Sequence, residues 1–268
     1  MESSLLKSIP NPVSLNNVSM KDAISFIGFL LRSILIIIVT IFYACLALAL
    51  GLSGMRRAYF IFARQWSSVL LKCAGVKVNI VGMEHLYPMQ RRIYVVNHTS
   101  YFDIPIILAS IPDSVRIMYR KNLERIPFMG WSLAASPFIG IQREKARDAM
   151  KGIEEAAKSV SIGESVVIFA EGTRSKDGRL GPFKRGAFML ASRSGKQLIP
   201  IAITGAQNIM LKDRWRFYPG TVSVTILSPI EPIDNMSREQ ESLLQHSVHS
   251  MINDALPPNM KSRNKEAI

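Results

Sequence analysis

The sequence has few of the residues and motifs on which many enzyme classes depend. Only two cysteines occur among 268 residues, Cys45 in an apolar run and Cys73 beyond it, which excludes a disulfide framework and a CxxC metal site. We interpret both as packing residues of a protein in a reducing compartment. There is no P-loop, no GxGxxG and no zinc-type histidine spacing. A GxSxG motif is also missing, which argues against a serine hydrolase.

Acidic residues are scarce relative to basic ones, with 20 Asp and Glu against 33 Lys and Arg, so the formal net charge is +13. Such a surface attracts nucleic acid, an anionic bilayer, or phosphorylated and acidic substrates. No basic helix with interleaved base-reading residues is evident, so we expect no nucleic-acid binding. Hydrophobic residues make up 48% of the chain, which is high for a soluble enzyme and indicates membrane contact.

Charge is missing altogether between Ser33 and Met55. About 23 residues at 1.5 Å each give roughly 34 Å of helix, enough to cross a hydrocarbon core. The segment lies too far from the N-terminus for a typical signal peptide. It could span the bilayer or form half of a hairpin that enters one leaflet. The polar residues 1–20 before it are interpreted as a flexible tail.

A second helix is expected from about Met55 to Ala74, where apolar residues recur at three- and four-residue steps. It is either an ordinary helix with one face on the core or an interfacial amphipathic helix on anionic headgroups. Residues 21–75 are therefore predicted to anchor the protein to a membrane. Arg56 and Arg57 favour a cytoplasmic position for the rest of the chain.

After Gly75 the pattern changes to alternating strands and helices. Strands are expected at 76–80, 93–96, 115–119, 138–142, 166–169, 198–204 and 222–227, and helices at 144–160, 183–195 and 236–256. Two of the strands, 93–96 and 166–169, are entirely apolar, as in a sheet covered on both faces. We therefore predict an α/β domain over residues 76–256, with a mostly parallel or mixed central sheet flanked by helices, followed by a disordered tail over 257–268.

Polar residues follow the first apolar strand, in the stretch IYVVNHTSYFD from Ile93 to Asp103. A histidine whose ring is held by a carboxylate is the smallest set of groups that general-base catalysis needs, so His98 and Asp103 are candidate catalytic residues. In a continuous helix the two would point about 140° apart, so the pair requires an intervening turn. The alternative is a local hydrogen bond for His98 and a helix cap for Asp103, near Pro105.

The second apolar strand opens into a loop that reads AEGTRSKDGRLGPFKRGA. Glu171, Gly172, Thr173 and Arg174 come first, and Lys184 lies near the next helix. A glycine allows close backbone approach, and arginine offers a fork of donors to a phosphate or carboxylate. The alternative is a solvated loop with a Glu–Arg ion pair. Neighbouring strand ends converge in a parallel sheet, which favours one crevice for both clusters.

Arg143 leaves the end of the strand at 138–142 and could direct another positive group at the same crevice, although alone it is equally a surface arginine. His85, His246 and His249 lie in a loop or in the C-terminal helix, and we expect no catalytic role for them.

These stretches together resemble the glycerolipid acyltransferases, most closely the 1-acyl-sn-glycerol-3-phosphate (lysophosphatidic acid) acyltransferases. Residues 97–103 are similar to the family's NHxxxxD block, and residues 169–175 to its FPEGTRS block, with Ala170 in place of the usual proline. Residues 139–143 resemble a second block, with Gln142 in place of the usual aspartate, and residues 199–202 resemble a fourth. The resemblance covers roughly residues 76–230.

The resemblance implies the glycerolipid acyltransferase fold and transfer of an acyl chain from acyl-CoA or acyl carrier protein to the sn-2 hydroxyl of lysophosphatidic acid. His98 would be the base and Asp103 its orienting group. Residues 171–174 would bind the acceptor's phosphate and glycerol, with help from Arg143 and Lys184. No metal, cofactor or covalent acyl-enzyme would be needed, and the site would face a membrane from its cytoplasmic side. Rival hypotheses are another lysophospholipid or lyso-aminolipid as acceptor, and a non-catalytic membrane-binding module.

Overall fold

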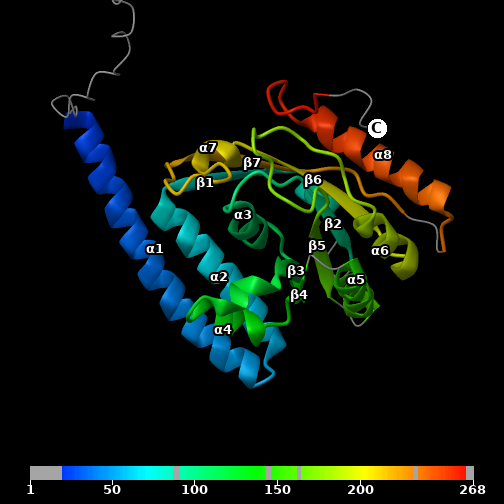
Figure 1. Ribbon diagram of the computed structural model, residues 1–268, viewed down its shortest axis with the longest axis horizontal. Coiled ribbons are helices and arrows are strands. Elements are labelled where there is room, and N and C mark those ends of the chain that lie inside the picture. Colours follow the sequence, from blue (N-terminus) through cyan, green and yellow to red (C-terminus); the bar gives the residue numbers. More distant parts are fainter. Residues whose placement is uncertain (1–19, 87–90, 143–145, 162–163, 232–234, 264–268) are drawn as a thin grey trace, which may run out of the picture.

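The computed structural model describes residues 20–86, 91–142, 146–161, 164–231 and 235–263 (Figure 1). The tail expected over residues 1–20 therefore lies almost entirely outside the described residues. Seven strands form one sheet: β1 (Val76–Val81), β2 (Ile93–Val96), β3 (Val115–Arg120), β4 (Ile139–Ile141), β5 (Ser165–Phe169), β6 (Leu198–Thr204) and β7 (Gly220–Ile226). Their spatial order is β1-β7-β6-β2-β5-β3-β4. Among the pairs between these strands only β6–β7 is antiparallel, which confirms the predicted mixed, mostly parallel sheet.

Helices cover both faces of the sheet, as predicted from its apolar strands. They are α1 (Met20–Leu52), α2 (Arg56–Ala74), α3 (Asp103–Ser110), α4 (Met129–Ala134), α5 (Ala146–Ser161), α6 (Gly186–Ser194), α7 (Ala206–Ile209) and α8 (Arg238–Ala255). The short helices α4 and α7 were not expected, because four to six residues are too few to show a helical period.

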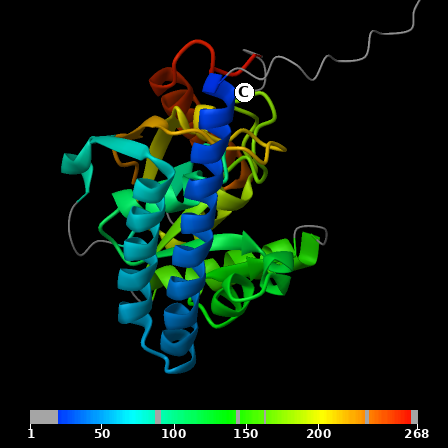
Figure 2. The same cartoon turned by 90° about the vertical axis from the view of Figure 1, so that its left-hand side faces the viewer.

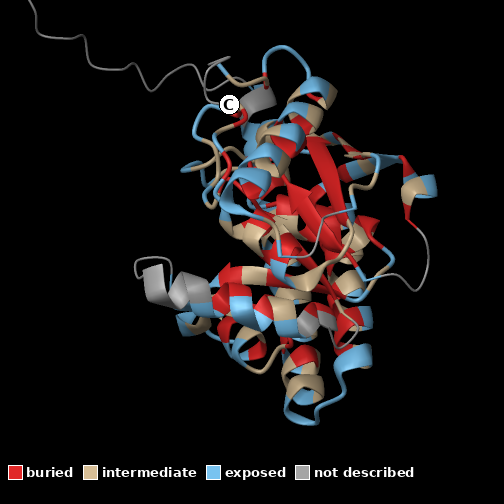
Figure 3. Ribbon diagram, turned by 90° about the vertical axis from the view of Figure 1, so that its right-hand side faces the viewer, coloured by how far each residue is buried: buried red, intermediate tan, exposed pale blue. Residues whose placement is uncertain are grey.

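The central strand β2 is inaccessible to solvent along its whole length (Figure 3). Tyr94 and Val96 pack in one apolar core with α2 and α3, while Ile93 and Val95 pack in the other with α5, α6 and α8. Successive side chains of a strand point to opposite faces, so a strand covered on both sides has to be apolar throughout. The sheet therefore fixes the carboxyl end of β2 rigidly.

The helices α1 and α2 form an antiparallel hairpin along one side of the domain (Figure 2). The part of α1 from Ala23 to Leu52 is the one described helix long and apolar enough to cross a membrane, and only 11% of its most apolar window is buried. The apolar stripe expected on α2 consists of Tyr59, Phe62, Trp66, Val69, Leu70 and Cys73. Of these, Tyr59 and Leu70 are buried on the domain, together with Ala63 and Ala74, and the other four are partly exposed. The helix thus packs on the core through one face.

The expectation of a disordered tail from Pro257 onward is wrong for residues 257–263. Met260 is almost inaccessible, with 1% exposure, and its carbonyl accepts a hydrogen bond of 2.8 Å from the Leu180 amide. Arg263 pairs with Asp177 at 3.1 Å. The polar composition concealed one buried methionine, which holds this segment against the loop after β5.

Candidate active site

The two candidate catalytic side chains meet at the carboxyl end of β2. The Nδ1 atom of His98 lies 2.8 Å from Oδ2 of Asp103. Asp103 is fully buried and begins α3, while His98 lies in the turn after β2. The predicted turn between the two is confirmed. With Nδ1 donating to the carboxylate, Nε2 of His98 carries the free electron pair of a base.

The turn is held by its own amides. Oδ2 of Asp103 also accepts hydrogen bonds from the amides of Thr99 at 2.7 Å and Ser100 at 2.8 Å. Because Asp103 is the first residue of α3 and binds amides that precede it, it does not cap that helix. These hydrogen bonds hold the carboxylate in place, and its contact with Nδ1 fixes the orientation of the imidazole ring.

Asn97 joins the turn to the neighbouring strand. The side-chain Nδ2 of Asn97 donates to the Ile203 carbonyl at 3.0 Å, and the side-chain Oδ1 accepts from the Ile203 amide at 2.7 Å. These two hydrogen bonds extend the pairing of β2 with β6 past the end of β2, through the Asn97 side chain. The ring of His98 stacks on Phe169, at the end of β5, with 4.1 Å between the centroids. Neither the Asn97–Ile203 hydrogen bonds nor the stacking of His98 on Phe169 was predicted from the sequence, although Asn97, His98 and Phe169 lie within the recognised motifs.

Glu171 connects the two polar clusters. Its Oε1 accepts from the His98 amide at 2.8 Å, and its Oε2 accepts from the Gly181 amide at 3.0 Å. Both oxygens of this predicted substrate-binding residue are therefore used by the protein's own backbone, and we assign Glu171 to positioning His98. Burial raises the pKa of Glu171 to about 7, although its two backbone hydrogen bonds oppose the shift.

In the loop after Glu171, Thr173 is exposed to solvent, whereas Gly172 and Arg174 are partly buried. Gly172 has a φ of +68°, which favours glycine, and the Lys184 side chain lies directly over it. The guanidinium of Arg174 lies 3.3 Å from the ring centroid of Tyr101, and its Nη1 is buried without a hydrogen-bond partner among the described residues. No ion pair joins Arg174 to Glu171 in the described part of the chain, contrary to the solvated-loop alternative.

An open depression of about 690 Å³ lies over this loop. Glu171, Thr173, Arg174 and Lys184 line it, together with Lys212, whose Nζ lies 3.3 Å from Oγ1 of Thr173. Lys212 lies outside every recognised motif and 39 residues beyond Thr173, so no sequence signal could have identified it. The depression is rich in cations and suits an anionic group.

The structure does not test the role expected for Arg143, because this residue lies outside the described residues. Gln142, directly before it, borders a different depression with Arg120 and Lys121. His249 is buried and its Nε2 lies 3.3 Å from the Gly181 carbonyl, so it supports the segment that binds Glu171.

Fold and site together define an α/β protein with a buried, hydrogen-bonded histidine–carboxylate pair at the carboxyl end of its central strand β2. Residues 77–204 match the Acyltransferase family. The chain is 35% identical over 156 residues to a chloroplastic 1-acyl-sn-glycerol-3-phosphate acyltransferase of Brassica napus, covering 58% of this chain and 45% of that protein. It is 28% identical to the 1-acyl-sn-glycerol-3-phosphate acyltransferase of Saccharomyces cerevisiae, over 85% of this chain and 77% of that protein.

Among solved structures, the 1-acyl-sn-glycerophosphate acyltransferase PlsC from Thermotoga maritima has a TM-score of 0.74 at 23% identity, covering 88% of this chain and 97% of that one. At this identity the match establishes the fold. Residues 77–204 therefore belong to the acyltransferase family, as their motifs indicated. The chain spans about half the length of the Brassica napus relative.

Proposed function

We propose that this protein transfers an acyl chain from an acyl thioester to the sn-2 hydroxyl of 1-acyl-glycerol-3-phosphate, forming phosphatidic acid. One observation carries the proposal. An oriented His98–Asp103 pair is held at a strand end by Glu171, which also lines a cation-rich depression. The names of the relatives support the same substrate class.

In the proposed reaction Nε2 of His98 takes the proton of the acceptor hydroxyl, and the oxygen attacks the thioester carbonyl carbon. The carbon–sulfur bond then breaks, and the departing thiolate receives the proton from the imidazolium. Asp103 stabilises the imidazolium through the 2.8 Å hydrogen bond to Nδ1. General-base assistance of this kind contributes about 10²–10⁴-fold in rate.

The acceptor phosphate is assigned to the depression after β5. Arg174 has a buried Nη1 without a described partner, and Lys184 and Lys212 line the same depression. A phosphate that receives a charge-assisted bond from Arg174 would satisfy this donor. Thr173, bonded to Lys212, would contact the glycerol portion.

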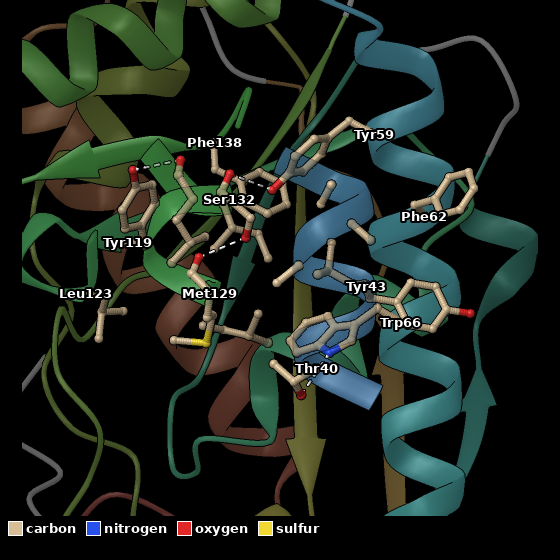
Figure 4. A pocket seen from close by; sticks show the side chains of 17 residues that line it. Thr40, Tyr43, Tyr59, Phe62, Trp66, Tyr119, Leu123, Met129, Ser132 and Phe138 are labelled. Carbon is tan, nitrogen blue, oxygen red and sulfur yellow. Dashed lines mark hydrogen bonds between the residues drawn. The ribbon is translucent and has the colours of Figure 1, made fainter. Parts of the chain in front are cut away.

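An apolar cavity of about 140 Å³ supports a lipid substrate (Figure 4). It lies between α1, α2, α4 and the start of α3, where Ile104 follows Asp103 directly. Two of its few polar groups are engaged within the protein: Tyr59 donates to the Ser132 carbonyl at 3.2 Å, and Trp66 donates to Thr40 at 3.3 Å. Such a lining suits an acyl chain, whose burial contributes about 0.8 kcal/mol per methylene.

The way α1 is held supports the membrane position that we propose. Near its start Arg216 donates to Ser25 at 2.9 Å, and near its end Gly51 packs so closely on the Ala135 carbonyl that a Cβ would lie 2.4 Å from it. A helix bound at both ends to the catalytic domain would carry polar loops into the hydrocarbon if it crossed the bilayer. We therefore place α1 along one leaflet, with α2 at the headgroups and the active site on the cytoplasmic side.

A cysteine in the α1–α2 turn tests this topology. Ser53→Cys, in a background of Cys45→Ser and Cys73→Ser, should react with a membrane-impermeant maleimide from the side that also reaches Ser242→Cys on α8, or from neither side. Reaction of position 53 from the opposite side alone would establish a spanning helix.

The acceptor assignment is tested by kinetics with separate substrates. Arg174→Ala should raise the KM for lysophosphatidic acid about 10- to 100-fold, as expected for a lost charge-assisted hydrogen bond, with little change in the KM for the thioester. A panel of acceptors should favour those with a phosphate monoester. A loss confined to the thioester would overturn the role of Arg174. Equal activity with a lyso-aminolipid would favour the other acceptor class.

Acyl-CoA and acyl carrier protein remain alternative donors in this proposal, and both offer the same thioester. Assays with each donor at equal acyl length distinguish them. A non-catalytic membrane-binding module would keep its lipid binding in His98→Ala and would show no turnover in the unmodified protein.

A further inference from the structure

The loop between α7 and β7, residues 211–218, carries an unusual combination of side chains. It reads LKDRWRFY and contains three cations and three aromatic residues. Trp215 is 70% exposed and Tyr218 is 49% exposed, although both are large and largely apolar. Tryptophan and tyrosine beside arginine and lysine are typical of the boundary between hydrocarbon and lipid headgroups. We call residues 211–218 the aromatic–basic loop.

The loop is attached to the start of α1. Phe29 of α1 contacts Phe217 at 5.2 Å and Trp215 at 5.3 Å between ring centroids. The guanidinium of Arg216 lies over the rings of Phe29 and Tyr218. Figure 2, which faces α1, shows the segment after α7 beside the N-terminal half of that helix.

The exposed apolar face of α1 continues from this attachment. Its large side chains that are at least 46% exposed near the loop and beyond it are Ile24, Phe26, Ile27, Leu30, Leu31, Ile34, Leu35, Ile37, Ile38 and Phe42. The aromatic side chains of the loop thus extend an apolar surface for which the proposed function already requires a lipid environment.

The cations of the loop lack carboxylate partners within the described residues. Lys212 contacts Thr173, Arg216 contacts Ser25 and aromatic rings, and the exposed guanidinium of Arg214 makes no ion pair there. A depression of about 360 Å³ lies under the loop, lined by Arg214, Trp215 and Arg216. Two guanidinium groups beside an indole ring match the phosphate and glycerol region of a phospholipid.

The other end of the loop reaches the active site. Leu211 forms a β-bridge with Ser100, whose hydroxyl also donates to the Met210 carbonyl at 2.7 Å. Ser100 in turn donates its amide to Asp103. One short segment therefore contacts α1, the catalytic turn and, through Lys212, the loop of Thr173 and Arg174.

We propose that the aromatic–basic loop is a second lipid-contacting element, which binds anionic headgroups through Arg214 and Arg216, inserts Trp215 at the interface, and so sets the active site at the bilayer surface. The inference rests on the proposed function, because it assigns the loop to the delivery of a membrane-borne acceptor. The loop is a binding element and takes no part in the chemical step.

Trp215 fluorescence tests the contact independently of catalysis. The chain has three tryptophans, so Trp66→Phe and Trp131→Phe leave Trp215 as the reporter. In the full chain reconstituted into vesicles, lipids brominated near the glycerol backbone should quench Trp215, and lipids brominated at the chain end should quench it less. Adding phosphatidylglycerol to phosphatidylcholine should strengthen the shallow quenching. Equal emission with brominated and unbrominated lipids would overturn the proposal, whatever the activity.

Arg214→Gln tests the charge contribution, since this exposed side chain has no described partner to lose. One basic residue near an anionic surface corresponds to about a fivefold effect. In phosphatidylglycerol-containing vesicles we expect the apparent KM for lysophosphatidic acid to rise about fivefold, with kcat unchanged and the phosphatidylglycerol-dependent quenching lost. The matched controls are Arg238→Gln and Leu243→Ser on α8, which is distant from α1 (Figure 1). If Arg214→Gln behaves like Arg238→Gln in both assays, the proposal is refuted.

Discussion

At each end of the central strands one aspartate accepts several hydrogen bonds, but the two networks differ in the chemistry left to their partners. At the amino end, Oδ2 of Asp113 accepts hydrogen bonds from the Tyr94 hydroxyl at 2.6 Å and the Ser165 hydroxyl at 2.9 Å, and it lies 3.7 Å from the fully buried Arg92. At the carboxyl end, Oδ2 of Asp103 accepts three bonds in the same way.

The difference lies in what the partners of each aspartate can still do. The Tyr94 hydroxyl donates its hydrogen bond to Asp113, and burial raises the pKa of this hydroxyl, so it stays protonated at neutral pH. His98 uses Nδ1 to bind Asp103, which leaves Nε2 for the proposed role as base. Two neighbours of the pair, Ile104 and Glu171, each line one of the two cavities. Asp113, whose side chain is 12% exposed, thus has a structural role at the amino end, whereas the proposed function makes the fully buried Asp103 the group that orients the base at the carboxyl end.

The largest expected effect is on turnover at the carboxyl end. His98→Ala should lower kcat about 10³-fold, which corresponds to about 4 kcal/mol of transition-state stabilisation. The free energy of unfolding should change little, because this side chain makes one hydrogen bond and one ring contact. Initial rates and urea unfolding in detergent measure the two quantities. Retained turnover would remove His98 from the role of base.

The second prediction concerns the hydrogen-bond network at the amino end of the central strands. Asp113→Ala should lower the free energy of unfolding by about 3 kcal/mol, because it leaves Arg92 buried without its carboxylate. Below the unfolding transition kcat should stay within about twofold of the unmodified protein. A fall in kcat like that of His98→Ala, with the fold intact, would show that the two ends are not separate.

A third effect concerns pH and Glu171. Its pKa is raised from 4.5 to about 7, so the folded state holds a proton that the unfolded state releases. The resulting stabilisation is complete below pH 4.5 and is lost as pH rises through 7, by about 3 kcal/mol at most. Glu171→Gln should remove this part of the pH dependence. Urea unfolding of both proteins across this window measures it, and parallel pH profiles would contradict the account.

The smallest effect concerns the apolar cavity beside Asp103. Ala63→Met on α2 should fill part of the cavity and lower kcat/KM for long acyl chains about fivefold, which corresponds to one or two methylenes of lost burial. Short chains should be unaffected. Rates with a series of chain lengths provide the measurement. A uniform fall across the series would indicate distortion rather than a chain-binding role.

Much of this comparison could be anticipated from residue patterns. Uninterrupted apolar runs at 93–96 and 166–169 identified the two buried strands, and the polar residues that follow them identified the catalytic end. The amino-end network was not anticipated, because Arg92, Asp113 and Ser165 are far apart along the chain and carry no motif. The different partners of Glu171, which binds two backbone amides, and Arg174, which lies over Tyr101, depend on backbone geometry that periodicity does not encode.

Long-range contacts account for the remaining differences. Lys212 reaches Thr173 because β6 and α7 return the chain to the same end of the sheet. The segment after Pro257 looks disordered by composition, yet the buried Met260 and the Arg263–Asp177 ion pair hold it against the domain. Such contacts are set by the packing of the whole domain rather than by any local pattern.

In the proposed function, the His98–Asp103 pair catalyses acyl transfer to a phosphate-bearing lysolipid. The most direct measurement follows free thiol and phosphatidic acid together, using purified protein, an acyl thioester and lysophosphatidic acid. We expect one thiol released for each phosphatidic acid formed, and almost no thiol without the acceptor. Equal thiol release in the absence of lysophosphatidic acid would identify a thioesterase and contradict the proposed function.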